Sequence, residues 1–266
     1  MAIYTDMADE LYKKGKGSVP AGVQIHTAHS GSITLTRVQI SRSGLARPAG
    51  RYSTLEVPSI AAMDDKDERF ISAVAGELRS MLPQAGLVLV VGVGNRRVTA
   101  DALGPRAAGN VLITRGLAPA TESLGLREVA AISPGASGTT GISLIHVLSA
   151  LVRTLKPAAL LCVDSLCSSD PDRLGRTVQI SDTGLCPSRP GSSRCITRAM
   201  LGVPVLAVGI PTLMEADEAL GGRKGFVITP RELDSVVRKG SNLLGLAINK
   251  ALQTKLSIAE LCYLAN

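Results

Sequence analysis

Four continuous apolar runs mark the middle of the chain, at residues 87–93, 128–132, 159–163 and 203–208. A strand that is apolar on both faces is typical of the buried interior of a largely parallel sheet. Helical stretches at 101–114 and 139–155 follow the first two runs, and the second carries its apolar residues on one face. Alternating strands and helices predict an α/β fold, a doubly wound sheet with helices on both sides.

The first third of the chain has a different pattern. Residues 33–40 alternate between apolar and polar side chains, and residues 51–57 do so approximately, which indicates antiparallel or edge strands. Residues 67–82 have an amphipathic pattern that predicts a helix ended by Pro83.

A helix start signal stands near the other end of the chain. Thr229 occupies an N-cap position, with Pro230 at the first helical position and Glu232 at the third, so we expect a helix from there to about Lys255. Residues 221–225 form the most flexible-looking connector. Because neither an internal repeat nor an interdomain linker is evident, we expect a single domain over residues 1–266.

The composition bears on whether the protein binds nucleic acid. The 266 residues include 29 Lys and Arg against 22 Asp and Glu, a net charge of +7. Single-strand binders stack bases on aromatic side chains, but this chain has two Phe, four Tyr and no Trp, widely spread. A solvated basic surface is therefore favoured over nucleic-acid binding. No apolar run is long enough to span a bilayer and no secretion signal is evident, so we also expect no membrane partner.

Five cysteines are scattered along the chain without a C-x-x-C pair. An odd count without that spacing argues against a disulfide framework and against a zinc knuckle. We therefore expect reduced, mostly buried thiols in an intracellular compartment.

Two aspartates stand out by their position. Asp164 ends the apolar run 159–163, and Asp101 lies just past the run that ends at Val93, at the mouth of the next helix. In open α/β sheets, ligands and catalytic groups gather at the carboxyl edge of the strands. The alternatives are structural: Asp101 or Thr99 caps the helix, and Asp164 fixes a turn.

Two glycine-rich segments raise the question of nucleotide binding. Gly92-Val93-Gly94 follows a strand, but Arg97 stands where the dinucleotide fingerprint needs a third glycine. Residues 133–141 could cradle an anion at the start of the next helix, with a tight strand-to-helix turn as the alternative. They lack the lysine of a P-loop, so nucleotide hydrolysis is disfavoured.

Other motifs have structural alternatives that we favour. Residues 182–184 read Asp-Thr-Gly, as in pepsin-type aspartic proteases, but those folds are all-β, so a turn is expected. His26 and His29 have a metal-chelating spacing without a third ligand nearby, which favours surface histidines. His146 is expected at the margin of the apolar face of its helix. No motif marks a Ser-His or Cys-His nucleophile pair.

Several segments carry a resemblance in their chain order: residues 51–56, 92–95, 98–105, 112–115, 134–141, 163–166, 177–184, 202–212 and 228–234. Together they resemble the germination protease (spore protease) family of spore-forming bacteria, and the likeness covers nearly the whole chain. The resemblance implies a three-layer α/β/α sandwich similar to that of hydrogenase maturation proteases. Its largely parallel central sheet is extended by the N-terminal antiparallel strands.

The resemblance also implies an activity and a location. Members of the family are endopeptidases that degrade small acid-soluble spore proteins during germination, and they are assigned to an atypical aspartic type. The implied partners are therefore those spore proteins, with no cofactor, in the cytoplasm of the forespore or the spore core. The family further implies a homo-oligomer, a tetramer.

The resemblance assigns the family's two carboxylates to Asp101, in Val98–Pro105, and to Asp164, in Val163–Leu166. Two neighbouring carboxyls do not both ionise readily, so one keeps a proton to polarise the amide while the other activates water. Residues of the matching motifs, which we expect to support the loops and the substrate, are Asn95, Thr99, Gly135, Gly138 and Asp182.

Two rival functions remain. Hydrogenase maturation proteases bind nickel through acidic residues and a His, but no His follows position 146 here, so we expect no metal site, although His146 remains a candidate ligand. The second rival is a homologue that binds spore proteins without cutting them.

The family is made as a zymogen. Residues 5–10 resemble its processing site, with cleavage expected between Asp6 and Met7, so residues 1–6 would form a short propeptide. The stretch between Glu215 and Phe226 looks shorter than the family pattern.

Overall fold

The computed structural model describes residues 4–12, 19–117, 123–186, 195–216 and 226–264. Its strands are, in chain order, β1 (Val23–Ser30), β2 (Ile33–Ile40), β3 (Gly50–Glu56), β4 (Val88–Gly92), β5 (Val129–Ile132), β6 (Ala159–Cys167), β7 (Thr177–Ser181), β8 (Val205–Glu215) and β9 (Val227–Ile228). They form one sheet in the order β1-β2-β3-β7-β8-β6-β4-β5, with β9 paired to β8.

The sheet has a parallel and an antiparallel half. β5, β4, β6 and β8 pair in parallel, and they correspond to the four apolar runs. β1, β2, β3 and β7 pair antiparallel, and β7 joins the two halves by pairing antiparallel with β8. The predicted α/β fold with added N-terminal antiparallel strands is confirmed. The sequence did not indicate β7 as a strand.

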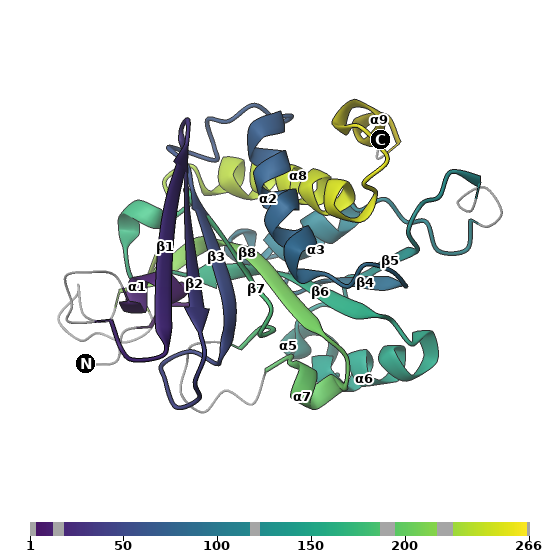
Figure 1. Cartoon of the computed structure of the whole chain (residues 1–266), viewed down its shortest axis with the longest axis horizontal. Helices are drawn as coiled ribbons and strands as arrows, with labels where there is room; N and C mark the ends of the chain where they lie inside the picture. The colour runs from purple at the N-terminus through teal and green to yellow at the C-terminus, as the bar shows by residue number, and fades with distance from the viewer. Residues whose placement is uncertain (1–3, 13–18, 118–122, 187–194, 217–225, 265–266) are drawn as a thin grey trace.

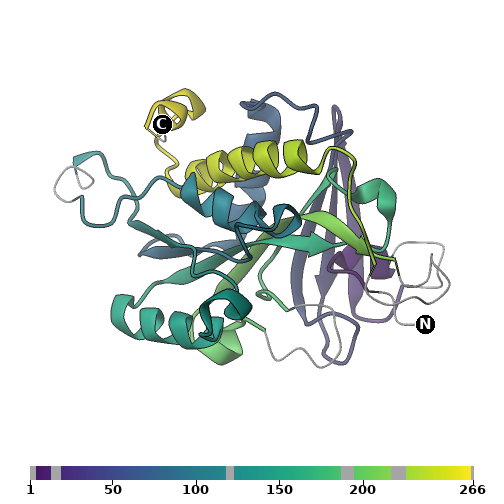
Figure 2. The same ribbon diagram turned by 180° about the vertical axis from the view of Figure 1, so that it is seen from behind.

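Helices cover both faces of the sheet (Figures 1 and 2). They are α1 (Ala8–Tyr12), α2 (Glu68–Met81), α3 (Leu103–Gly109), α5 (Ser137–Thr140), α6 (Leu144–Leu155), α7 (Arg198–Leu201), α8 (Leu233–Leu252) and α9 (Ile258–Leu264), with short 3-10 turns η1 (Thr99–Asp101) and η2 (Pro171–Arg173). α2, α3 and α8 lie on one face, and α6 and α7 on the other. The described helices include none that is long and apolar enough to cross a membrane.

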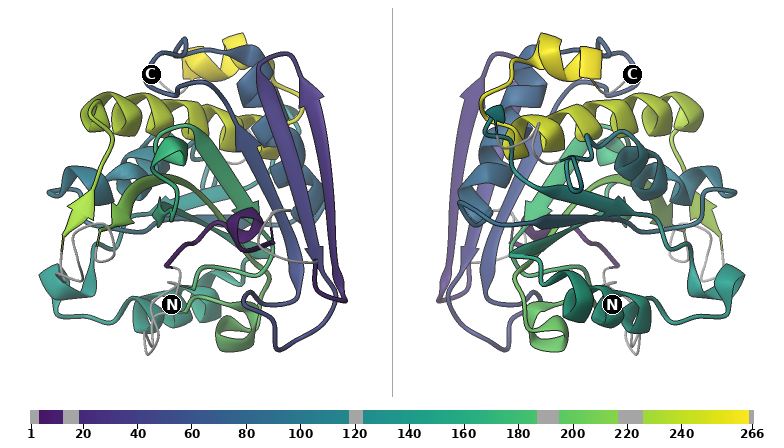
Figure 3. Two further views of the ribbon diagram at one scale, coloured as in Figure 1. Left: turned by 90° about the vertical axis from the view of Figure 1, so that its left-hand side faces the viewer. Right: turned by 90° about the vertical axis from the view of Figure 1, so that its right-hand side faces the viewer.

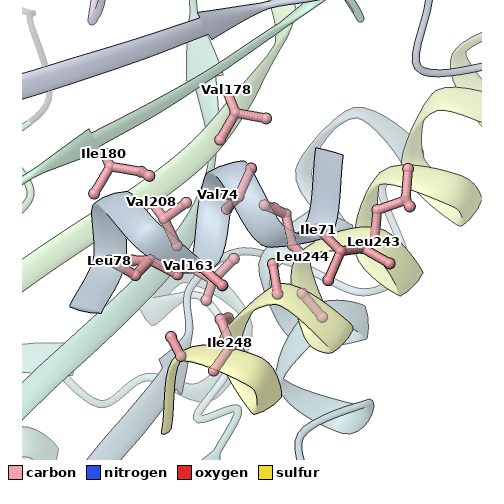
Figure 4. Packing of buried hydrophobic residues seen from close by; sticks show 14 of the residues in the cluster. Ile71, Val74, Leu78, Val163, Val178, Ile180, Val208, Leu243, Leu244 and Ile248 are labelled. Atoms are coloured by element: carbon pink, nitrogen blue, oxygen red, sulfur yellow. The ribbon is translucent and has the colours of Figure 1, made fainter. Parts of the chain in front are cut away.

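Alternating side chains of the central strands divide the core in two. In β6, Leu161 and Val163 pack in the cluster beneath α2, α3 and α8. Figure 4 shows Val163 among the residues of this cluster. Leu160 and Cys162 pack in the cluster beneath α6 and α7. Because successive side chains of a strand point to opposite faces, Asp164 lies on the face covered by α6.

The N-terminal segment lies on that same face. Ala8 and Tyr12 of α1 pack against Val38 of β2 and Tyr52 of β3. Figure 3 shows α1 on the side of the sheet away from α8. Residues near the start of the chain are thereby built into the core.

Two predicted helices are shorter than the pattern indicated. The helix expected at 101–114 is η1 followed by α3, which ends at Gly109. It ends there because Leu112 donates its N–H to the Asn249 side chain and Thr114 donates its N–H to the Val129 carbonyl. The helix expected at 139–155 is divided into α5 and α6, because Gly141 adopts the left-handed conformation at φ 69°.

The two remaining helix predictions differ in outcome. The helix expected at 67–82 is confirmed as α2, with the Asp67 side chain accepting from the Phe70 N–H at 2.8 Å. The helix expected from Thr229 begins at Leu233, so the predicted Thr229 cap is wrong. The chain just before it is held extended, because Ile228 pairs with Met214 of β8. The connector at 221–225 lies outside the described residues.

Candidate active site

Asp101 and Asp164 line one cavity of about 410 Å³, which lies beyond the carboxyl end of β4 and beside β6. The two strands are parallel neighbours with Gly92 in register with Val163, so the residues that follow them emerge at one edge of the sheet. The other walls come from the segment 135–145, Leu185 and residues 195–196. The structure therefore brings together the two aspartates that the strand ends indicated.

A tight loop positions Asp101 after β4. The Asn95 backbone N–H donates to Asp101 Oδ2 at 2.7 Å. Gly94 has φ +120°, and a Cβ atom there would lie 2.1 Å from the Asp101 carbonyl oxygen. Only glycine lets the loop pass this close to Asp101. No side-chain capping bond is made at the start of η1 or α3, so the alternative in which Asp101 or Thr99 caps the helix does not hold.

Asp164 lies within β6 and not at its end as the apolar run indicated, because β6 continues to Cys167; it stands just beyond the last residue of β6 that pairs with β4. Its Oδ1 accepts the Ser165 backbone N–H at 2.8 Å, and its side chain is partly exposed to the cavity but otherwise enclosed by protein. Gly104 of α3 packs on the same strand, since a Cβ atom there would lie 2.2 Å from the Val163 carbonyl oxygen. This close approach holds α3, and η1 before it, against β6.

The pKa values of the two carboxyls are both raised, but to different extents. Burial raises the pKa of Asp164 well above its usual value, and the negative charges of Asp101 and Asp6 raise it further, against the bond from Ser165. Burial also raises the pKa of Asp101, but the Asn95 N–H opposes that effect. Asp164 is therefore the carboxyl of the pair that more readily keeps its proton, and Asp101 is the one that more readily ionises.

The other predicted site residues lie at different distances from this pair. Gly135 lines the cavity, whereas Gly138 and Thr99 do not. Asn95 contributes its backbone N–H, and its side chain accepts the Arg97 N–H at 3.0 Å. Asp182 lies outside the cavity and ties β3 to the end of β7, accepting from both the backbone N–H and Nε of Arg51 at 2.8 Å.

One wall of the cavity was missed by the sequence analysis. Leu185 and Ile196 form an isolated antiparallel bridge, and next to it Cys186 and Cys195 form a disulfide. The expectation of reduced thiols throughout is therefore wrong for these two cysteines. It was based on counts and close spacings, whereas the bridge returns the chain on itself and brings their Cα atoms to 4.3 Å. The sequence carried no signal for this pairing.

The predicted processing site lies against the end of β6, the strand that carries Asp164. The Asp6 N–H donates to the Cys167 carbonyl and Asp6 Oδ2 accepts the Cys167 N–H, both at 2.8 Å. The Gln179 side chain bonds the Asp6 carbonyl and the Ala8 N–H, both at 2.6 Å. Met7 is fully buried. Cleavage between Asp6 and Met7 therefore requires this segment to leave its position first.

The donor groups fit a metal site poorly. Within the described ranges, no group of three or more His, Cys, Asp or Glu side chains is arranged to hold a metal ion. His146 is exposed on α6, and His26 and His29 lie on β1, the edge strand at the opposite end of the sheet order from β4 and β5. Two carboxylates without a third side-chain ligand do not make the closed sites that nickel or zinc prefers.

An α/β/α sandwich with paired carboxyls at a sheet edge fits a hydrolase that activates water, and comparison with known proteins identifies the family. The family model for germination proteases matches residues 3–222. The chain belongs to the germination protease family, whose members are proteases that act in spore germination.

Individual relatives agree with this assignment. A germination protease of Caldanaerobacter subterraneus subsp. tengcongensis is 36% identical, over 98% of this chain and 83% of its own length. One of Clostridium acetobutylicum is 30% identical over 98% of both chains. One of Bacillus cytotoxicus is 36% identical over 85% of this chain and 67% of its own.

The Gly94 loop gives a first prediction. We expect Gly94→Ala to lower kcat/KM for proteolysis about 100-fold in a folded protein, because the new methyl group displaces Asp101. Gly116→Ala is the matched control: Gly116 also has positive φ, at +86°, but no atom of the described residues lies within 4 Å of a Cβ atom there. Steady-state kinetics on both variants make the comparison, and equal activity of the two would contradict the role given to Gly94.

Proposed function

We propose that this protease is an endopeptidase of an atypical aspartic type, in which Asp101 and Asp164 activate water between them. The observation that carries the proposal is the shared cavity, in which burial and the charge of Asp101 raise the pKa of Asp164. A buried pair with one proton supplies both an acid and a base at the same pH. The absence of a Ser-His or Cys-His motif in the sequence supports water as the nucleophile.

In this mechanism each carboxyl has one role in each step. Ionised Asp101 takes a proton from water as the water oxygen bonds to the scissile carbonyl carbon. Asp164 gives its proton to the carbonyl oxygen, which produces a neutral tetrahedral diol. The C–N bond then breaks as Asp101 passes its proton to the leaving amine. One hydroxyl of the diol returns its proton to Asp164, which leaves a carboxylic acid product and restores the pair.

We propose small acid-soluble spore proteins as the substrates, in the forespore or spore core, in keeping with the family. The apolar side chains of Ile142, Leu185 and Ile196 on the cavity wall would contact an extended substrate segment. We also propose that residues 1–6 are removed between Asp6 and Met7 during maturation and that the active form is a tetramer. Because the proposed partners are spore proteins and not DNA, the net charge of +7 needs no role in nucleic-acid binding and is a general property of the surface.

Cleavage of a purified small acid-soluble spore protein tests the proposed function. We expect discrete fragments by mass spectrometry, at an unchanged rate in the presence of a strong chelator. Asp101→Asn should form no fragments, because an amide does not accept the proton of water. Cleavage lost on chelation and restored by a divalent metal would favour the maturation-type metalloprotease. Binding of the spore protein by the wild-type chain without fragments would favour the non-catalytic homologue.

A further inference from the structure

The disulfide between Cys186 and Cys195 lies at the base of one wall of the candidate site. Its S–S distance is 2.07 Å, and its two cysteines are nine residues apart. It stands directly beside the bridge between Leu185 and Ile196, whose backbones exchange two hydrogen bonds of 3.0 and 2.7 Å. Both residues of this bridge, and Cys195, line the cavity that contains Asp101 and Asp164.

The bridge is short, so its position depends on what holds it. A single bridged pair is much weaker than a strand pairing of several residues, since isolated two-stranded elements are only marginally stable. Leu185 and Ile196 are otherwise held by packing in the cluster that includes Met7 and Leu201. The disulfide joins the two chain segments of the bridge covalently. It therefore limits how far Leu185 and Ile196 separate when this part of the structure opens locally.

The bond is also accessible to reaction. Cys186 and Cys195 are both partly exposed, whereas Cys162 and Cys262 are buried. Disulfides persist poorly where thiol reductants are abundant, so a partly exposed disulfide responds to the redox state of its surroundings. Nothing in the proposed chemistry of the aspartate pair uses this bond.

We propose that Cys186–Cys195 is a redox-sensitive positioning site that holds Leu185 and Ile196 in place beside the aspartate pair. This inference rests on the proposed function for its effect on cleavage. A dithiol reduces the bond: its two sulfurs lose two electrons and form their own disulfide, while the Cys186–Cys195 bond breaks and each cysteine gains a proton. The bridge then loosens, and the substrate-facing wall moves away from Asp101 and Asp164.

Two readouts on the full chain test this inference. The first is amide hydrogen exchange at Leu185 and Ile196, which we expect to become at least about tenfold faster on treatment with excess dithiothreitol. The amides of β6 should keep their rates. The second is kcat/KM on a peptide substrate, which we expect to fall about tenfold on reduction and to recover on reoxidation with oxidised dithiothreitol.

Matched variants separate this bond from the other thiols. Cys186→Ser/Cys195→Ser should show fast exchange at Leu185 and Ile196 and low kcat/KM without reductant, and no further response to it. Cys262→Ala keeps the disulfide and should respond as the wild type does.

Each contrary result has a distinct meaning. Unchanged exchange at Leu185 and Ile196 on reduction would overturn the inference. Faster exchange with unchanged kcat/KM would overturn it as well, because the wall would then not matter for cleavage. If neither redox state cleaves any peptide, the proposed function fails, and the inference as a statement about cleavage fails with it. The exchange rates would then report the bond's structural effect separately.

Discussion

Asp164→Asn is expected to lower kcat for peptide cleavage by at least about 1,000-fold while the protein stays folded. Burial and the charge of Asp101 make Asp164 the proton-holding member of the pair, and an amide in its place gives up no proton to the scissile carbonyl. The measurement is steady-state cleavage, with circular dichroism to establish the fold. Asp172→Asn, on an exposed turn away from the cavity, is the matched control and should keep full activity.

The same variant has an expected effect on stability with a defined sign. Because the folded-state pKa of Asp164 is raised, the folded protein binds this proton more tightly than the unfolded chain does. The resulting stabilisation is complete below the ordinary pKa of 3.8 and is lost as the pH rises through the folded-state pKa. At alkaline pH, Asp164→Asn should therefore melt at or above the wild-type temperature. Lower stability at that pH, or kcat above a tenth of the wild-type value, would contradict the assignment of Asp164.

The wild-type pH profile follows from the same pair. Activity should fall at acid pH as Asp101 takes up a proton, and again at higher pH as Asp164 loses its own. Since the pKa values of both Asp101 and Asp164 are raised, we expect the enzyme to be active over a higher pH range than a pair of aspartates with ordinary pKa values would allow.

The parallel half of the sheet and the aspartate pair could be predicted from local pattern. Runs apolar on both faces occur where strands are buried on both sides, so the sequence located β4, β5, β6 and β8. Once those strands are parallel neighbours, Asp164 and the residues after Gly92 must emerge at the same edge. The reason for glycine at position 94 is visible only in the fold, because the Asp101 carbonyl oxygen is the atom that excludes a side chain there.

Features set by contacts between distant segments could not be predicted. The Leu185–Ile196 bridge and its disulfide have no local signature. The early end of α3 depends on Asn249, which lies on α8 and takes the N–H of Leu112. The start of α8 is delayed because β9 pairs with the end of β8 and keeps Ile228 extended. At both helix ends a tertiary contact overrides the local propensity of the sequence.

The prediction with the largest expected effect on stability concerns Arg173. Its Nη1 donates to Asp9 Oδ1 at 2.9 Å and lies 3.4 Å from Glu10 Oε1, and its Nη2 lies 2.9 Å from Asp9 Oδ2 in an ion pair. All three side chains are 5% exposed or less. We expect Arg173→Met to lower the free energy of unfolding by about 3–5 kcal/mol, because it leaves two buried carboxylates without their counter-charge. Urea unfolding at neutral pH measures this difference.

The pH dependence of that deficit identifies its cause. Burial raises the pKa of Glu10, but hydrogen bonds from Ser168, Thr5 and Ser169 outweigh it and leave the pKa below its ordinary value. Glu10 is therefore charged at neutral pH, and the cost of Arg173→Met should shrink as acid protonates Glu10. Arg231→Met, at an exposed position, should change stability by less than about 0.5 kcal/mol. A deficit that stays constant from pH 7 to acid pH would mean that lost packing, and not the unpaired charges, destabilises the variant.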